Sequence, residues 1–256
     1  MDRLILSFFT SMKIYKALQI GDFHLNNCED YLYSGEIGSN KCLCAVMDGC
    51  TMGIDSYFVS TLVGKLLRKI AKEKGYKEMY EYDSSLEDID KYLRSILSDL
   101  FKELKIIQNQ LMLEFKEMPT TLIILLIDTQ KNEGIVLVIG DGLVSINGSI
   151  TEFDQDNKPD YLGFHLNENF ETWYENQPQK IKITNVEDIS IATDGIFMFS
   201  EVAKKVSNEH IDAIKFLVLN KEYSENEEML NVKLKKLESE FGLKPTDDLA
   251  IIRILK

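Results

Sequence analysis

Acidic residues stand at the ends of apolar runs at several points of this chain, and they are the residues best suited to do chemistry. They are Glu29-Asp30, Asp48, Asp141, Asp194 and Asp247-Asp248. A carboxylate at the edge of a hydrophobic core is rare unless it is paired or binds a cation. One such aspartate is usually a turn residue or a helix cap. The repetition at predicted strand ends favours a shared cation site, with Asp48 at its centre.

The ligand type indicates which metal would bind. An all-oxygen ligand set favours magnesium or manganese over zinc or copper. The three histidines, His24, His165 and His210, are scattered, and the four cysteines include no Cys-x-x-Cys pair, so a zinc site is not predicted. Two divalent ions that share a carboxylate can activate a water and hold a phosphoryl group for attack. They would also let a phosphate enter an acidic pocket. These acids therefore predict a metal-dependent phosphatase site.

Composition and charge limit the partners. The chain has 256 residues, 45% of them hydrophobic, and a formal net charge of −13. A negative field repels nucleic acids and anionic membranes, so neither is an expected partner. No linker-like stretch is visible, so we expect one domain over residues 1–256, with its core at about 13–256. The apolar patch Leu4–Phe9 is too short to span a bilayer and does not look like a signal peptide, which makes a cytoplasmic location the expectation.

Hydrophobic periodicity predicts the elements that must position the acids. Strands are predicted over Ile14–Ile20, Tyr31–Ile37, Lys41–Met47, Thr120–Ile127, Gly134–Ile139, Leu143–Ile146, Ser149–Phe153, Lys180–Thr184, Ile189–Thr193 and Leu249–Leu255. Helices are predicted over Ile54–Lys74, Asp88–Glu114, Glu201–Leu219 and Ser224–Phe241. This order is typical of the α+β class.

Two smaller patterns add to this outline. Residues 154–179 have no clean period and are predicted to form a flap-like irregular segment. Trp173 and Tyr174 in that segment could form a substrate platform, but they are better interpreted as anchoring the flap on the core. Cys42 and Cys44 are two residues apart in a predicted strand and should face the same side as small core residues.

Six short motifs follow one another along the chain: Cys28-Glu29-Asp30, Val46-Met47-Asp48-Gly49, Thr120-Thr121, Ile139-Gly140-Asp141, Ala192-Thr193-Asp194-Gly195 and Thr246-Asp247-Asp248-Leu249-Ala250. In order and spacing they resemble the motifs of the protein phosphatase type 2C family, the metal-dependent serine/threonine phosphatases. The chain looks like a divergent bacterial-type member of that family. Each motif alone is weak, but the ordered set spans roughly Tyr15 to Leu255 and is specific. The resemblance implies a four-layer α-β-β-α sandwich, with two antiparallel sheets flanked by helix pairs and metals at one edge.

The resemblance also implies roles for individual residues. Asp48 would bridge two magnesium or manganese ions and the Gly49 carbonyl would bind one of them; Glu29 would reach the second ion through water, Asp194 and Asp247 would hold the first, and Asp141 with Asp194 would form a third site. Asp30 would support these ligands from beside Glu29. A water bridging the two ions would attack the phosphorus of a phosphoserine or phosphothreonine in a protein substrate. Catalysis through this water would depend on Asp48, Glu29 and Asp194.

Two departures from the family pattern lie beside these ligands. Leu25 stands where the family usually has an arginine that grips the substrate phosphate, and the neighbouring His24 is the candidate substrate-binding residue. Cys50 follows the Asp-Gly pair where some members have a histidine. Losing a charge-assisted phosphate contact weakens substrate binding by about 1.5–3 kcal/mol. Two alternatives therefore stay open: a catalytically weakened phosphatase-like binding or regulatory domain that keeps the metal site, and an acidic structural domain that binds no divalent ion. A monomer is expected in each case.

Overall fold

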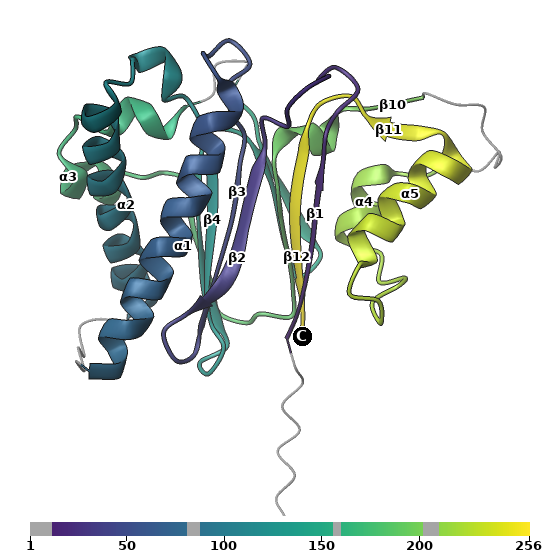
Figure 1. Ribbon diagram of the computed structural model, residues 1–256. Coiled ribbons are helices and arrows are strands. Elements are labelled where there is room, and N and C mark those ends of the chain that lie inside the picture. Colours follow the sequence, from purple (N-terminus) through teal and green to yellow (C-terminus); the bar gives the residue numbers. More distant parts are fainter. Residues whose placement is uncertain (1–11, 81–87, 156–159, 202–209) are drawn as a thin grey trace, which may run out of the picture.

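The protein forms four layers, in which two five-stranded antiparallel sheets face each other between two layers of helices (Figure 1). The computed structural model describes residues 12–80, 88–155, 160–201 and 210–256. The first sheet has the order β1 (Lys13–Gln19), β12 (Leu249–Leu255), β9 (Asp188–Ala192), β6 (Gly142–Ile146) and β7 (Ser149–Phe153). The second has the order β2 (Tyr31–Ile37), β3 (Lys41–Met47), β4 (Leu122–Asp128), β5 (Glu133–Ile139) and β8 (Lys180–Ile183). The short strands β10 (Phe199–Glu201) and β11 (Leu243–Pro245) pair separately.

Each sheet is covered on its outer face by helices. The long helices α1 (Ser56–Tyr80) and α2 (Ile89–Leu111) cover the β2–β8 sheet, and the short helix α3 (Phe170–Glu175) packs beside α2. Helices α4 (Ala213–Val218) and α5 (Met229–Phe241) cover the other sheet. The expected α+β sandwich with flanking helix pairs is confirmed. No helix among the described residues is long and apolar enough to cross a membrane.

The continuous apolar runs form strands that are buried on both faces. In β3, Leu43, Ala45 and Met47 point toward α1 and α2, whereas Cys42 and Cys44 point toward the opposite sheet. The two sulfurs lie 3.8 Å apart, as expected from their spacing, and all four cysteines of the chain are free. Such strands lack the polar alternation of a half-exposed sheet, because both faces are covered.

Local signals fix several element ends. Asp88 caps α2, with its side chain accepting hydrogen bonds from the backbone nitrogens of Asp90 and Lys91. Asn147 and Gly148 both have positive φ in the turn between β6 and β7, which is the requirement of a type I′ turn. Trp173 is 4% exposed and packs against Phe101 of α2, so it anchors the flap segment and is too deeply buried to serve as a substrate platform.

Several predicted boundaries were wrong. Helix α1 continues beyond Lys74 to Tyr80, and α2 ends at Leu111 although Glu114 was predicted as its last residue. The predicted helix Glu201–Leu219 is reduced to α4, since Glu201 belongs to β10 and residues 210–212 precede the helix; residues 202–209 lie outside the described residues. The last predicted helix begins at Met229 and not at Ser224. Strands β10 and β11 were not predicted.

Strand pairing brings the acidic motifs to one end of both sheets. Tyr31 pairs with Met47, so the residues before β2 lie beside those after β3. Ile251 pairs with Ala192, so the residues before β12 lie beside those after β9. Ala192 also pairs with Leu143, which places the loop between β5 and β6 at the same edge. Antiparallel register thus gathers residues that are far apart in the chain.

Candidate active site

The backbone around Asp48 is held firmly at this edge. Its carbonyl accepts hydrogen bonds from the Thr120 hydroxyl and the Thr121 backbone nitrogen, both at 2.8 Å, and its own nitrogen donates to the Thr121 hydroxyl at 3.1 Å. The Gly49 nitrogen donates to the Glu29 carbonyl at 3.2 Å. A Cβ on Gly49 would lie 2.0 Å from the Ser56 carbonyl oxygen. Glycine is therefore required after Asp48 by close packing of α1, in addition to any freedom that the turn needs.

Two carboxyl groups, those of Asp30 and Asp48, meet at the centre of the site. Asp30 is 2% exposed and accepts a hydrogen bond from the Thr193 hydroxyl at 2.6 Å, and it lies close enough to Asp48 for each carboxyl to perturb the pKa of the other. Burial raises the pKa of the Asp48 carboxyl well above its ordinary value, and the nearby charges of Asp30 and Asp194 raise it further. Burial likewise raises the pKa of the Asp30 carboxyl, although the hydrogen bond from Thr193 opposes this. The pair needs a proton or a cation to be stable.

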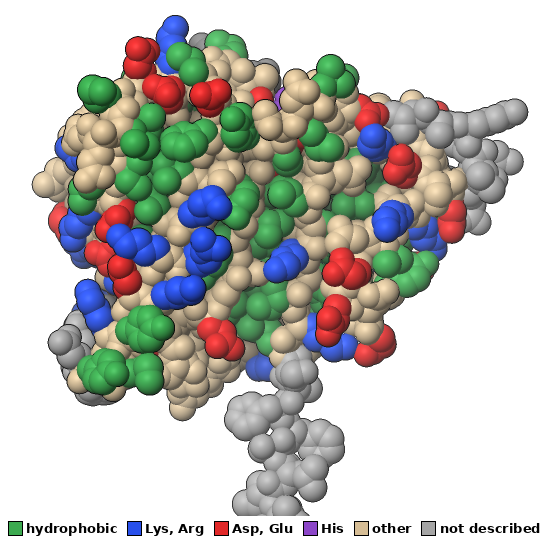
Figure 2. All heavy atoms as spheres, viewed as in Figure 1, with side chains coloured by type: hydrophobic (Ala, Val, Ile, Leu, Met, Phe, Trp, Pro, Cys, Tyr) green, Lys and Arg blue, Asp and Glu red, His purple; other side chains and the backbone are tan. Residues whose placement is uncertain are grey.

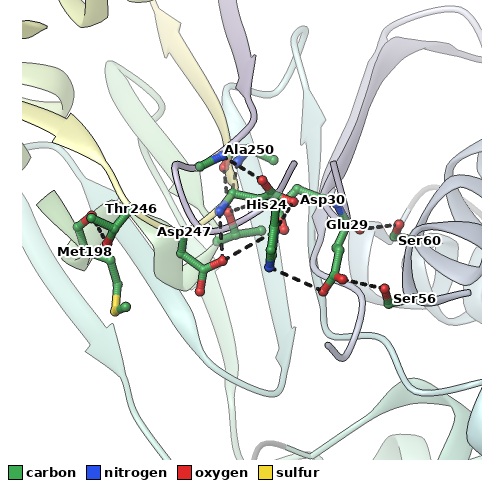
Figure 3. A network of polar contacts seen from close by, with 12 residues as sticks. His24, Glu29, Asp30, Ser56, Ser60, Met198, Thr246, Asp247 and Ala250 are labelled. Carbon is green, nitrogen blue, oxygen red and sulfur yellow. Dashed lines mark hydrogen bonds and ion pairs between the residues drawn. The ribbon is translucent and has the colours of Figure 1, made fainter. Parts of the chain in front are cut away.

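Glu29 is fixed through one carboxylate oxygen, and the other accepts no hydrogen bond. Ser56, the first residue of α1, donates to Glu29 Oε1 at 2.5 Å, and the Ser60 hydroxyl donates to the Glu29 backbone carbonyl at 2.5 Å. Glu29 Oε2 and Asp30 Oδ1 are both buried without a hydrogen-bond partner. Figure 3 shows the one contact drawn to Glu29 Oε2, the 4.0 Å ion pair with His24 Nε2. Buried oxygens without a donor are unusual and indicate a place for a cation.

Asp248 ties the loop before Glu29 to the start of β12. Its Oδ1 accepts from the Gly21 nitrogen at 2.7 Å, and its Oδ2 accepts from the Glu29 nitrogen at 2.5 Å. His24 Nδ1 lies 2.8 Å from the same Oδ2, and its Nε2 lies 4.0 Å from Glu29 Oε2. Figure 3 shows the imidazole between Asp247 and Glu29. The sequence pattern did not separate Asp248 from Asp247, because both stand in one motif.

Asp194 and its neighbours form the other part of the site. The pKa of Asp194 is raised to about 7, mainly by burial and then by the charges of Asp141 and Asp247. Burial also raises the pKa of Asp141. A Cβ on Gly195 would lie 1.8 Å from the Asp248 carbonyl oxygen, so the second Asp-Gly pair is also set by close packing. Asp141, Asp194 and Asp247 are therefore near enough to influence one another.

The described residues nevertheless contain no group of three or more Asp, Glu, His or Cys side chains close enough to hold a metal ion. The structure brings the predicted ligands to one edge and leaves them apart by more than a common ion would require. The site fits a hard divalent cation in its oxygen donors, its raised carboxyl pKa values and its two unpartnered oxygens. The ligand set of Glu29, Asp48, Gly49, Asp194, Asp247 and Asp141 stays a prediction.

Sequence reasoning missed several residues at this edge. Thr193 and Ser60 are buried hydroxyl residues whose partners lie on other elements. Tyr161 lies near Cys50, and its hydroxyl pKa is raised by burial above all and also by Cys50 and the charge of Asp48. Leu25, at the position of the usual arginine, is 89% exposed. Only Thr193 carried a sequence signal, since it directly precedes Asp194-Gly195.

Comparison with known proteins places these observations in a family. A family model described as "Protein phosphatase 2C" matches residues 20–237. A search of curated proteins gave no match.

Solved structures resemble the fold at low sequence identity. A bacterial serine phosphatase superposes with a TM-score of 0.62 at 14% identity, covering 96% of this chain and 100% of the other. The "S. agalactiae serine/threonine phosphatase" gives a TM-score of 0.57 at 13% identity, covering 96% of this chain and 99% of the other. The SpoIIE chain of Bacillus subtilis, a phosphatase domain with a regulatory fragment, gives 0.56 at 15% identity over 96% of this chain, which matches only 63% of that chain. These likenesses show the fold.

Proposed function

Because the chain belongs to the protein phosphatase 2C family, we propose that it is a metal-dependent phosphoprotein phosphatase that hydrolyses phosphoserine and phosphothreonine. The observation that carries this proposal is the buried contact between Asp30 and Asp48 beside the unpartnered Oε2 of Glu29. Carboxyl groups gathered at the edge of a hydrophobic core are rare unless they are paired or bind a cation.

The metal ligands are assigned from residues at this edge of the sheets. We assign two magnesium or manganese ions to Glu29, Asp48, the Gly49 carbonyl, Asp194 and Asp247, with Asp141 and Asp194 available for a third. When bound, such ions supply positive charge for the substrate phosphate and lower the pKa of a water that attacks phosphorus. A neighbouring solved structure of this fold, RsbX, is a complex with magnesium (TM-score 0.53, 15% identity, covering 95% of this chain and 94% of that one).

The chain itself contributes positioning. Thr120 and Thr121 hold the Asp48 backbone, Ser56 holds one oxygen of Glu29, and Asp248 holds the loop that carries His24. Because His24 faces the carboxylates and is largely buried, we assign it to the phosphate-facing side of this loop, where it would contact the substrate in place of the usual arginine. No side chain in this arrangement is proposed as a covalent nucleophile.

The test is hydrolysis of p-nitrophenyl phosphate with magnesium or manganese, followed by phosphoserine and phosphothreonine peptides. Metal-stimulated turnover that chelator removes and that Asp48→Asn abolishes is the expected result. Asp99→Asn is the matched control, because Asp99 lies on α2 and its ion pairs among the described residues are with Lys74 and Lys102, not with any residue of the carboxylate centre. Turnover that is indifferent to chelator or to Asp48→Asn would refute the proposal. Manganese binding by calorimetry without turnover of any phosphopeptide would favour the alternative of a phosphatase-like binding domain, to which Leu25 and Cys50 point.

A further inference from the structure

Large apolar side chains are exposed on the loops that surround the carboxylate centre. We call the following set the apolar rim: Phe23, Leu25, Met52, Ile54, Phe115 and Met198. Leu25 and Met52 are 89% and 91% exposed, more than most residues of any type. A single exposed apolar residue is ordinary, but several gathered around one site indicate a binding surface. Figure 2 shows hydrophobic side chains among the acidic ones along the upper edge of the molecule, where these loops lie.

One side of the rim is built on the β2–β8 sheet. Met52 and Ile54 follow Asp48-Gly49, and the Ile54 nitrogen donates to the Lys116 carbonyl at 3.1 Å, which places it beside Phe115. The ring of Phe115 stacks on that of Phe164 at 5.0 Å. The loop after β3, the turn before β4 and the flap segment thus form one continuous apolar border.

The other side is built on the β1–β7 sheet. The Phe23 nitrogen donates to the Thr246 carbonyl at 2.9 Å, and the Thr246 nitrogen donates to the Met198 carbonyl at 2.7 Å. Figure 3 shows Met198 and Thr246 beside Asp247. Phe23 and Leu25 flank His24, whose contact with Asp248 holds this loop against the start of β12.

The acids lie between these two borders. Glu29 contacts Ser56 just beyond the Met52–Ile54 loop, and Asp247 directly follows Thr246 in the opposite border. Any phosphate group that reaches the carboxylates must therefore bring the residues on either side of it against the rim. A substrate with large apolar side chains at those places would cover surface that is otherwise in water.

We propose that the apolar rim selects substrates: it binds phosphoproteins whose phosphorylated serine or threonine is flanked by large apolar side chains. This inference rests on the proposed phosphatase function. Apolar contacts give affinity that does not depend on gripping the phosphate, which suits a site with Leu25 in place of an arginine. Burying one leucine or methionine side chain fully is worth about tenfold or more in affinity.

The charge of the surface favours a protein partner over a lipid one. The chain carries a formal net charge of −13, and the rim encloses a group of carboxylates. Anionic membrane surfaces would be repelled at this place. An apolar segment that carries one phosphate is attracted by the rim and, in the presence of divalent metal, by the centre.

The experiment compares three short peptides: phosphoserine flanked by Leu and Phe, phosphoserine flanked by Gln and Ser, and the unphosphorylated apolar peptide. Binding is measured by fluorescence anisotropy and turnover by phosphate release, each with manganese. The apolar phosphopeptide is expected to bind at least about tenfold more tightly than the polar one and to have the higher kcat/KM. The double variant Leu25→Ser/Met52→Ser should remove most of this difference. Both side chains are so exposed that their replacement leaves the fold intact.

Met79→Ser/Leu111→Ser is the matched control, because both residues are exposed and lie at the far end of α1 and on the last turn of α2. It should keep the peptide preference and the turnover of p-nitrophenyl phosphate. A preference in binding without turnover of any substrate would support the rim and refute the phosphatase function. Turnover with equal binding of both phosphopeptides would refute the rim and keep the function. Binding of the chain to phosphatidylcholine vesicles that depends on Leu25 and Met52, without a peptide preference, would show a membrane surface and also refute the proposal.

Discussion

Asp247 and Asp248 are neighbours in sequence, and we predict that they have different roles. Asp248 supports the stability of the fold, and Asp247 binds metal. Asp248 is 2% exposed and accepts hydrogen bonds from the Gly21 and Glu29 nitrogens, with His24 Nδ1 at 2.8 Å. The Asp247 side chain is 33% exposed and accepts one hydrogen bond, from the Asp248 nitrogen. Asp248 therefore acts in positioning, and Asp247 has the freedom that a metal ligand needs.

The magnitude follows from the hydrogen bonds. In Asp248→Asn one oxygen becomes an NH2 group, which must face either the Gly21 nitrogen or the Glu29 nitrogen, both of them donors. One charge-assisted hydrogen bond is lost, at about 1.5–3 kcal/mol, and a buried donor is left unpaired, at about 1–3 kcal/mol. We expect a loss of about 3 kcal/mol in the free energy of unfolding. Asp247→Asn keeps its acceptor oxygen and should change the free energy by less than about 0.5 kcal/mol.

Two measurements separate these residues. Urea unfolding of the metal-free protein gives the free energies, and calorimetric titration with manganese gives the affinities. Asp247→Asn should keep the stability and lose manganese affinity, whereas Asp248→Asn should lose stability first. Equal destabilisation by the two substitutions, or less than about 0.5 kcal/mol for Asp248→Asn, would contradict the assignment of roles.

Three further predictions concern buried charges. Arg253→Met should lower the free energy of unfolding in urea by about 3–5 kcal/mol, because Arg253 is fully buried and pairs with Asp188 through two hydrogen bonds of 3.0 and 2.8 Å. Adding Asp188→Leu should recover most of this loss. If the losses from the two single substitutions simply add in the double variant, the prediction is contradicted. Hydrogen bonds to Asp160 and Glu168 outweigh burial and raise the pKa of His165 above its ordinary 6.5, so this contact stabilises the flap below pH 6.5 and weakens as the pH rises through the raised value. The fluorescence of Trp173, whose ring lies 5.6 Å from the imidazole, should titrate accordingly and lose this transition in His165→Gln. Asp48→Asn should raise the stability of the metal-free protein by about 1 kcal/mol in urea unfolding, because it removes a buried like charge, and a loss would contradict the crowding of acids.

The strands could be predicted where burial and turns agree. The bounds of β3 and β12 match the prediction, because each is an apolar run between clear turn residues. The bounds of β2 match as well, although this strand contains Ser34, Gly35 and Glu36. Helix ends were predicted less well. The first helix was predicted to end at Lys74, but α1 continues through Gly75 to Tyr80, since one glycine in a long helix costs only about 1 kcal/mol. Strand β10 exists because it pairs with β11, and local periodicity contains no information about a partner.

The site was predictable as a set of acids and not as an arrangement. Asp48 and Asp194 could be recognised because an aspartate followed by glycine ends a buried strand. The role of Asp248 could not, because its partners are backbone nitrogens that β12 reaches only after folding. The sequence also does not reveal that Gly49 is needed for close packing against Ser56.

The carboxyl groups at this edge make opposing contributions to stability and function. Placing the Asp30 and Asp48 carboxylates together away from water destabilises the folded protein. The hydrogen bond from the Thr193 hydroxyl to Asp30 offsets only part of that cost. The edge stays formed because its backbone is held by groups that carry no catalytic role, such as Thr120 under Asp48 and the three contacts of Asp248. A cation would relieve the repulsion between the carboxylates, so metal affinity is generated by the same crowding that weakens the metal-free fold. Substitutions that merely relax the acids should therefore stabilise the protein while they remove its function.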